Sequence, residues 1–98
     1  MQETYANTRD GRKVVAAAGT AERLVSANTR CSEVTITAES DNTGDIVIGD
    51  STVVASAATR RGAPLVPGAS YTIKIEDLYQ LWIDADVSSD GVVFVYHF

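Results

Sequence analysis

Residues that build reactive or metal-binding centres are scarce in this sequence. It holds one cysteine, Cys31, and one histidine, His97. A lone cysteine cannot close a disulfide within the chain, and the two side chains together are too few ligands for a structural zinc site. We therefore expect no metal and no cofactor, and we expect stability to come from sheet packing or from assembly.

Long hydrophobic runs are missing as well. No apolar stretch approaches the roughly 18 residues that a membrane-spanning helix needs, so we expect no membrane partner. The first thirteen residues, MQETYANTRDGRK, are polar and lack the apolar segment of a secretory signal. Synthesis in a cytoplasm is the expectation that follows.

Positive charge is also in short supply. The 98 residues carry 8 Lys and Arg against 13 Asp and Glu, a net charge of −5, which argues against nucleic acid as a partner. The positive charges gather early, because residues 1–30 hold five Lys and Arg against three acids, and residues 31–98 hold three against ten. A basic segment on an acidic body fits docking onto an acidic protein surface or onto a neighbouring copy. Ordinary surface solubility explains the asymmetry equally well.

Alternation of polar and apolar residues is the pattern that the chain does have. The segment EVTITAE at 33–39 alternates over its whole length, which is typical of a half-buried strand. The turn formers DNTG at 41–44 follow, and the apolar segment DIVI comes next at 45–48. We predict that these two strands form a hairpin.

Further strands are predicted in the second half of the chain. Alternation returns at 71–75 and 81–87. The β-branched and aromatic segment 92–98 fits a strand in the centre of a sheet, or one covered by a partner. Pro64 and Pro67 exclude a central strand between them. The residues expected to face the core are Val34, Ile36, Ala38, Tyr71, Ile73, Ile75, Leu81, Ile83, Ala85 and Val87.

Short strands at this spacing predict an all-β, single-domain fold, a sandwich or barrel of seven or eight antiparallel strands. We expect the domain to span residues 13–98, with one or two strands within 13–26. Residues 1–12 are expected to form a flexible N-terminal arm.

Three stretches of the chain share their order of motifs with a known group of proteins. They are CSEVTITAESDNTGDIVIGD at 31–50, PGASYTIKIEDLYQLWIDADV at 67–87 and GVVFVY at 91–96. In this order, the chain resembles small bacteriophage structural proteins of the capsid-decoration and head-fibre kind. The resemblance runs from Cys31 onward, about two-thirds of the chain, and it implies a jelly-roll-like sandwich on a phage particle without catalytic residues.

Two acidic groupings in the sequence have side chains of the kinds found in reactive or metal sites. Paired carboxylates beside an aromatic ring occur in glycoside hydrolases, but alternation places Asp84, Asp86 and Trp82 together on the solvent face, opposite the core. The turn residues with side-chain oxygens lack the spacing of a calcium loop, and we interpret them as turn formers. These residues are Asp41, Asn42, Asp45 and Asp50. No nucleophile elbow, cysteine-protease signature or phosphate loop is present, so we do not expect an enzyme.

The expected function is that of a virion structural protein, made in the bacterial host. It would associate with itself, plausibly as a trimer, and bind a capsid or other virion protein as a decoration or head-fibre protein. The alternative is a tail-associated or carbohydrate-binding module, with Trp82, Tyr79 and Tyr71 as its aromatic platform. Basic residues near the N-terminus, a pair of arginines and two residues of late strands are the candidate interface: Arg9, Arg12, Lys13, Arg60, Arg61, Trp82 and His97.

Overall fold

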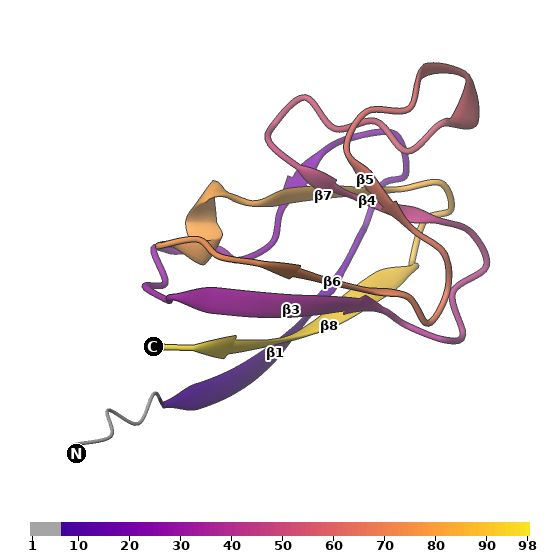
Figure 1. Cartoon of the computed structure of the whole chain (residues 1–98). Helices are drawn as coiled ribbons and strands as arrows, with labels where there is room; N and C mark the ends of the chain where they lie inside the picture. Colours follow the sequence, from indigo (N-terminus) through magenta and orange to yellow (C-terminus); the bar gives the residue numbers. More distant parts are fainter. Residues whose placement is uncertain (1–6) are drawn as a thin grey trace, which may run out of the picture.

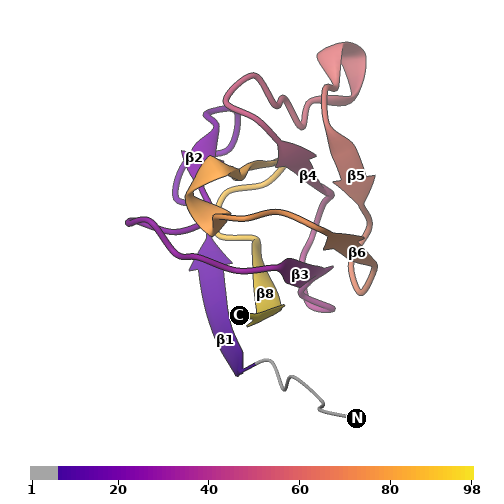
Figure 2. The ribbon, with the colours of Figure 1, turned by 60° about the vertical axis from the view of Figure 1, so that its left-hand side comes forward.

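A computed structural model describes residues 7–98, which form two four-stranded antiparallel sheets packed face to face (Figures 1 and 2). The first sheet has the strand order β1-β8-β3-β6, and the second has the order β2-β7-β4-β5. The strands are β1 (Thr8–Val14), β2 (Glu22–Arg23), β3 (Glu33–Ala38), β4 (Ile46–Gly49), β5 (Ala63–Leu65), β6 (Ser70–Ile73), β7 (Trp82–Ala85) and β8 (Gly91–His97), with single 3₁₀ turns η1 (Ala57–Thr59) and η2 (Leu78–Gln80). The expectation of an all-β sandwich with seven or eight antiparallel strands is confirmed.

The strands pair in a nested order. β1 pairs with β8, β2 with β7, β3 with β6, and β4 with β5. The pairings β3–β8 and β4–β7 then join these pairs into the two sheets. The chain therefore follows the path of one long hairpin whose closed end is the β4–β5 pair. Along this hairpin, successive strand pairs lie alternately in the first and the second sheet.

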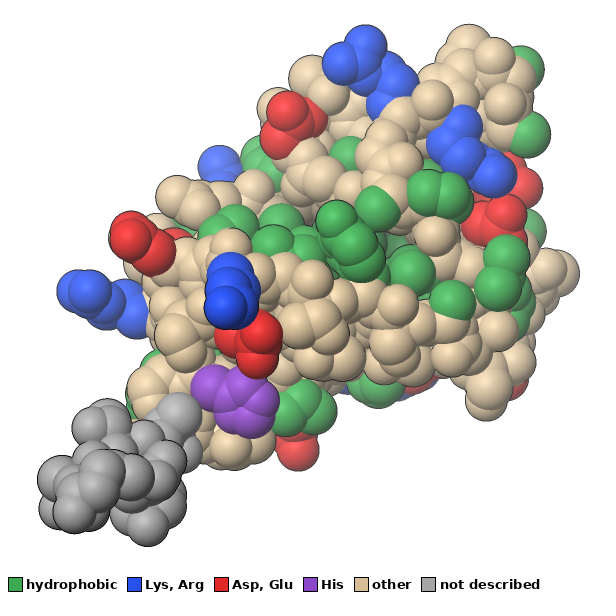
Figure 3. All heavy atoms as spheres, in the orientation of Figure 1, with side chains coloured by type: hydrophobic (Ala, Val, Ile, Leu, Met, Phe, Trp, Pro, Cys, Tyr) green, Lys and Arg blue, Asp and Glu red, His purple; other side chains and the backbone are tan. Residues whose placement is uncertain are grey.

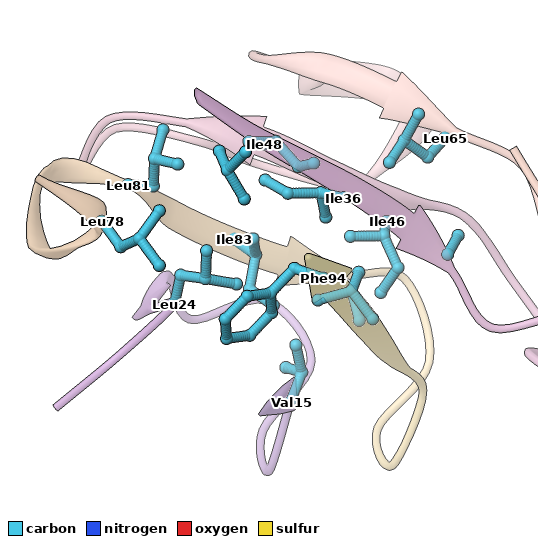
Figure 4. Packing of buried hydrophobic residues seen from close by; sticks show 14 of the residues in the cluster. Val15, Leu24, Ile36, Ile46, Ile48, Leu65, Leu78, Leu81, Ile83 and Phe94 are labelled. Carbon is cyan, nitrogen blue, oxygen red and sulfur yellow. The ribbon is translucent and has the colours of Figure 1, made fainter. Parts of the chain in front are cut away.

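The hairpin expected between 33–39 and 45–48 is wrong. β3 and β4 lie in different sheets, and the turn between them carries the chain from one layer to the other. Each of these strands has an apolar face, and the two faces pack against each other across the core. Ile36 of β3 and Ile46 and Ile48 of β4 belong to one buried cluster (Figure 4).

The flexible arm expected at residues 1–12 is wrong for residues 8–12, which belong to β1 and pair along their length with β8. Residues 1–6 of that arm lie outside the described residues. Alternation did not reveal β1, because its segment TRDGRKV is mostly exposed and polar. The strand forms because β8, which pairs with β3 on its other side, supplies the hydrogen bonds of β1.

The core lies between the layers, where most of the expected inward residues are buried. Val34, Ile36 and Ala38 are confirmed, as are Leu81, Ile83 and Ala85. β8 is central as predicted, and its Val92, Phe94 and Tyr96 join the same cluster. Ile73 and Ile75 are partly buried against it.

Two expected core residues are exposed. Tyr71 is on β6, the edge strand of the first sheet, so its side chain reaches the open side of the sandwich. Val87 lies beyond the end of β7 at Ala85, where alternation no longer governs its direction. Figure 3 shows hydrophobic side chains in a band along this open side, between β6 and the second layer.

The second sheet is covered on its outer face as well. Val47 of β4 is fully buried there and packs against Val53 and Ala55 of the long connection between β4 and β5. Ala21 and Trp82 pack against the same small cluster. The first sheet has no such cover among residues 7–98, so the two outer faces of the molecule differ.

Candidate protein-binding surface

The outer face of the first sheet is open and partly apolar. Val93 and Val95 of β8 point outward, with 40% and 41% of their surfaces exposed. Because directly paired residues point to the same side of an antiparallel sheet, the pairing register gives their neighbours. Val95 lies between Asp10 and Thr35, and Val93 between Arg12 and Thr37.

Hydroxyl groups next to these valines pair with each other. The Thr35 and Thr72 hydroxyls are 2.9 Å apart, and those of Thr37 and Ser70 are 2.7 Å apart. Each hydroxyl therefore has a partner within the sheet, and the methyl groups of the threonines remain beside Val93 and Val95. This part of the face costs little to desolvate, since the paired hydroxyl groups keep their hydrogen bonds when a partner covers them.

A shallow hollow of about 560 Å³ adjoins Val93 at one end of this face. Thr37, Glu39 and Asp41 line it from one side, and Gly68 from the other. It offers room for a side chain of a docked partner and presents carboxylates at its rim.

Three of the predicted interface residues lie on β1, where each has a partner within the chain. Arg12 forms a two-pronged ion pair with Glu39, at 2.6 and 3.1 Å. Lys13 contacts Glu22 at 2.9 Å, and the guanidinium of Arg9 lies 5.2 Å from the centre of the Phe98 ring. Of these contacts, only the Arg12–Glu39 pair joins the basic segment to an acidic group on the body of its own chain. The charge distribution alone does not distinguish such a contact from docking on a neighbour.

Glu22 also receives two backbone hydrogen bonds. Although burial alone raises the pKa of Glu22, the N–H groups of Ala17 and Ala16 and the ammonium of Lys13 favour its charged form and lower the pKa below its usual value. This carboxylate holds the start of the connection between β1 and β2 in place.

His97, the fourth predicted residue on this side, lies on β8 opposite Thr8 of β1. Its Nδ1 is 3.2 Å from the Thr8 hydroxyl. The four predicted residues therefore lie on the paired strands β1 and β8, but the register places Arg12 and His97 on the outer side of the sheet and Arg9 and Lys13 on the inner side.

The other three predicted residues lie elsewhere. Arg60 donates two hydrogen bonds to the Ala55 carbonyl and contacts Asp45 at 3.3 Å, so it anchors the connection between β4 and β5. Arg61 has an exposed side chain, while its backbone bridges Val54.

Trp82 is half-buried on β7, where the guanidinium of Arg23 lies against it. The guanidinium carbon is 4.6 Å from the centre of the Trp82 ring and 3.7 Å from that of Tyr79. Arg23 also donates to the Tyr79 carbonyl. One face of each ring is thereby occupied, and Tyr71, the third residue of the predicted aromatic platform, lies on the other sheet.

The expectation that Asp84 faces solvent is wrong, because this carboxylate is fully buried. It accepts hydrogen bonds from the N–H groups of Gly19, Ala55 and Ala85, each at 2.9 Å. Two loops close over the outer face of β7, and Asp84 accepts one backbone hydrogen bond from each of them, at Gly19 and at the buried Ala55. Asp86 is exposed as expected, so the two carboxylates do not share one environment.

Asp90 and Asn42 also accept hydrogen bonds from backbone N–H groups of distant parts of the chain. The sequence pattern did not identify this role for either residue. Asp90, nearly buried, accepts from the N–H groups of Thr43 and Gly44, and the amide of Asn42 bonds both backbone groups of Gly91. Two of the four residues with oxygen donors considered for a calcium site therefore already have partners within the chain. Asn42 bonds Gly91, and Asp45 contacts Arg60.

Asp77 begins η2 and joins it to a distant loop. It accepts from the N–H groups of Thr29, at 2.7 Å, and Tyr79, at 2.9 Å. These bonds lower the pKa of Asp77 below its usual value. An aspartate just before a short apolar turn is a capping signal that the sequence does carry.

Cys31 is half-buried and directs its Sγ toward the Ile75 carbonyl at 3.0 Å. Burial, together with the nearby charge of Asp77, raises the pKa of the thiol. The arrangement disfavours the thiolate that a nucleophile or metal ligand requires.

Comparison of the chain with protein-family models, with curated proteins and with solved structures finds no match in any of the three. No helix within residues 7–98 has the length and hydropathy to cross a membrane. The fold is that of a small β-sandwich, and its most distinctive surface is the uncovered outer face of the first sheet together with the β1 edge.

Proposed function

We propose that this protein is a structural component of a bacteriophage particle, a decoration or head-fibre protein that associates with itself and attaches to the capsid lattice. Attachment is through the outer face of the first sheet. The motifs at 31–50, 67–87 and 91–96 support the proposal, since they resemble proteins of this kind. The nested strand pairing supports it too, because two sheets ordered β1-β8-β3-β6 and β2-β7-β4-β5 are compatible with the jelly-roll-like sandwich that the resemblance implies.

The observation that carries the proposal is the unequal cover of the two sheets. The chain uses its own β4–β5 connection to bury the outer face of the second sheet, including Val47. On the first sheet, Val93 and Val95 stay exposed beside paired hydroxyl groups. A face that exposes apolar groups at its centre, beside hydroxyl groups that are already paired with each other, is suited to contact with another protein.

A small contact surface is sufficient for attachment when the docking site is repeated many times on a particle. A capsid lattice presents the same docking site many times, and copies that are linked to each other bind it together. The second contact is then intramolecular, and the overall affinity exceeds that of one contact by a factor of about 10² or more when the geometry allows both.

The test is co-sedimentation with purified capsids of the phage or prophage that encodes the chain. Val95→Arg places a charge in the centre of the proposed contact, and we expect it to abolish binding while the far-ultraviolet spectrum stays that of a β-protein. Val66→Arg is the matched control, because Val66 is also an exposed valine, at 58%, but lies outside this face. Failure of the unaltered protein to bind capsids, or equal loss in both variants, would refute the proposal.

A further inference from the structure

The outward edge of β1 carries backbone hydrogen-bonding groups that have no partner among residues 7–98. Asn7 and Phe98 exchange both backbone hydrogen bonds, at 2.7 and 2.9 Å, and the Val15 N–H donates to Asp90 at the other end of the same register. Odd-numbered residues of β1 therefore bond to β8. The N–H and C=O groups of the even-numbered residues point away from the sheet: Thr8, Asp10, Arg12 and Val14.

β1 is the longest edge within the described part of the chain. β2 has two residues, β6 has four, and β5 has three and contains Pro64, whose nitrogen cannot donate. These are the usual means by which edge strands avoid pairing. β1 has seven residues, and the nearest segment, 24–26, lies across a hollow of about 340 Å³ from it.

We propose that a second copy of this chain pairs with this edge, antiparallel, about a two-fold axis that passes through Gly11. The two first sheets then become one sheet of eight strands. Asp10 of each copy lies opposite Arg12 of the partner subunit, and Thr8 lies opposite Val14 of the partner subunit. All four outward residues of each strand find backbone partners.

Charge selects this register among those that the backbone allows. Outward groups can bond only to outward groups, so the axis must pass through a residue. An axis through Asp10 places two aspartates directly opposite each other, and an axis through Arg12 places two arginines opposite each other. Like charges directly opposite destabilise a pair of strands, whereas opposite charges stabilise it.

The existing contacts of the two charged residues permit the new pair. Asp10 is exposed and has no ion-pair partner among the described residues. Arg12 contacts Glu39, but 61% of its side chain is exposed, and a guanidinium has five N–H donors with which to bind a second carboxylate.

One cross-strand contact opposes this register. Arg9 lies opposite Lys13 of the partner subunit on the inner side of the sheet. The charge of Lys13 is offset by Glu22 of its own chain at 2.9 Å, and Arg9 is stacked on Phe98. These contacts weaken the repulsion.

The pairing specifies the self-association that the proposed function includes. It aligns the outer faces of two first sheets on one side of the assembly, which doubles the surface available for docking. The dimer is measured without capsids and capsid attachment is measured with them, so either proposal can fail while the other stands.

The test is sedimentation equilibrium with a charge-reversal set. We expect the unaltered protein to approach twice the chain mass as concentration rises. Asp10→Arg gives four facing arginines and Arg12→Asp gives four facing aspartates, so each variant alone should dissociate at least about tenfold more readily. A mixture of the two variants restores both opposite-charge pairs, and we expect a heterodimer close to the original affinity. The double variant Asp10→Arg/Arg12→Asp should also dimerise.

The mixture separates the proposal from a folding defect, because two misfolded variants would not bind each other. A monomer up to about 1 mM, a concentration at which even weak specific pairs form, would overturn the proposal. So would a trimer, or a mixture that associates no better than its components.

Amide hydrogen exchange gives an independent readout. On dilution from dimer to monomer, the Asp10 and Arg12 amides should lose protection, while the Gly11 and Lys13 amides, bonded to β8, should keep it. Equal protection of all four amides at every concentration would contradict pairing at this edge.

Discussion

Gly11 of β1 lies directly against the ring of Phe94 on β8. The two residues are paired in the sheet, and a Cβ placed on Gly11 would come within 2.4 Å of Phe94 Cζ. The missing side chain is what allows the aromatic ring to lie over β1 and close this side of the core. Glycine at position 11 thus lets the Phe94 ring pack directly against the backbone of the polar edge strand β1.

We expect Gly11→Ala to lower the free energy of unfolding by about 1–3 kcal/mol, since the ring must move within a packed core. Denaturant titration measures the change. In a Phe94→Leu background, the smaller side chain leaves room for the new methyl group, so the same substitution should cost less. Equal costs in the two backgrounds would show that the ring is not the cause.

Asp84→Ala should destabilise the fold by about 1–3 kcal/mol, because it leaves the N–H group of the buried Ala55 without a partner and removes the bond that holds Gly19. Hydrogen exchange at these two amides should become faster. Asp86→Ala, two residues along and exposed, is the control and should change stability by no more than about 0.5 kcal/mol.

Acid should weaken the loops that carboxylates hold. The folded-state pKa of Glu22 is lowered, so its contribution to stability is present above the unfolded value of about 4.3 and is lost as pH falls through the folded value. Asp77 acts in the same direction. We expect urea midpoints to fall as pH decreases from about 5 to 3, and we expect Glu22→Gln to reduce this dependence. Glu33→Gln, which removes none of these bonds, should leave the slope unchanged.

Arg23→Ala should lower stability by about 1 kcal/mol, the scale of a partly exposed cation–π contact. Trp82 is the single tryptophan, so its emission reports the change directly and should shift to longer wavelength as water reaches the ring. Arg23→Lys keeps the charge and loses the planar stack, so an intermediate shift is expected. An unaltered spectrum in both variants would contradict the stack.

The sequence by itself determined the class of fold. Alternation located the inward faces of β3 and β7, and the β-branched, aromatic composition of 92–98 placed β8 in the centre of a sheet. These predictions succeeded because local side-chain direction in a strand has a period of two, whatever the partner. The sequence also shows directly that the chain holds a single cysteine and a single histidine, too few for an internal disulfide or a structural zinc site.

Tertiary structure alone decided which strands pair and which polar residues are buried. β3 and β4 have the pattern of a hairpin, but they lie in different sheets, and Ile36 of β3 packs with Ile46 and Ile48 of β4 in one cluster across the core. Asp84 alternates as a surface residue, yet loops from distant parts of the chain cover it and supply its hydrogen bonds. Such contacts depend on residues far apart in sequence, so no local pattern encodes them.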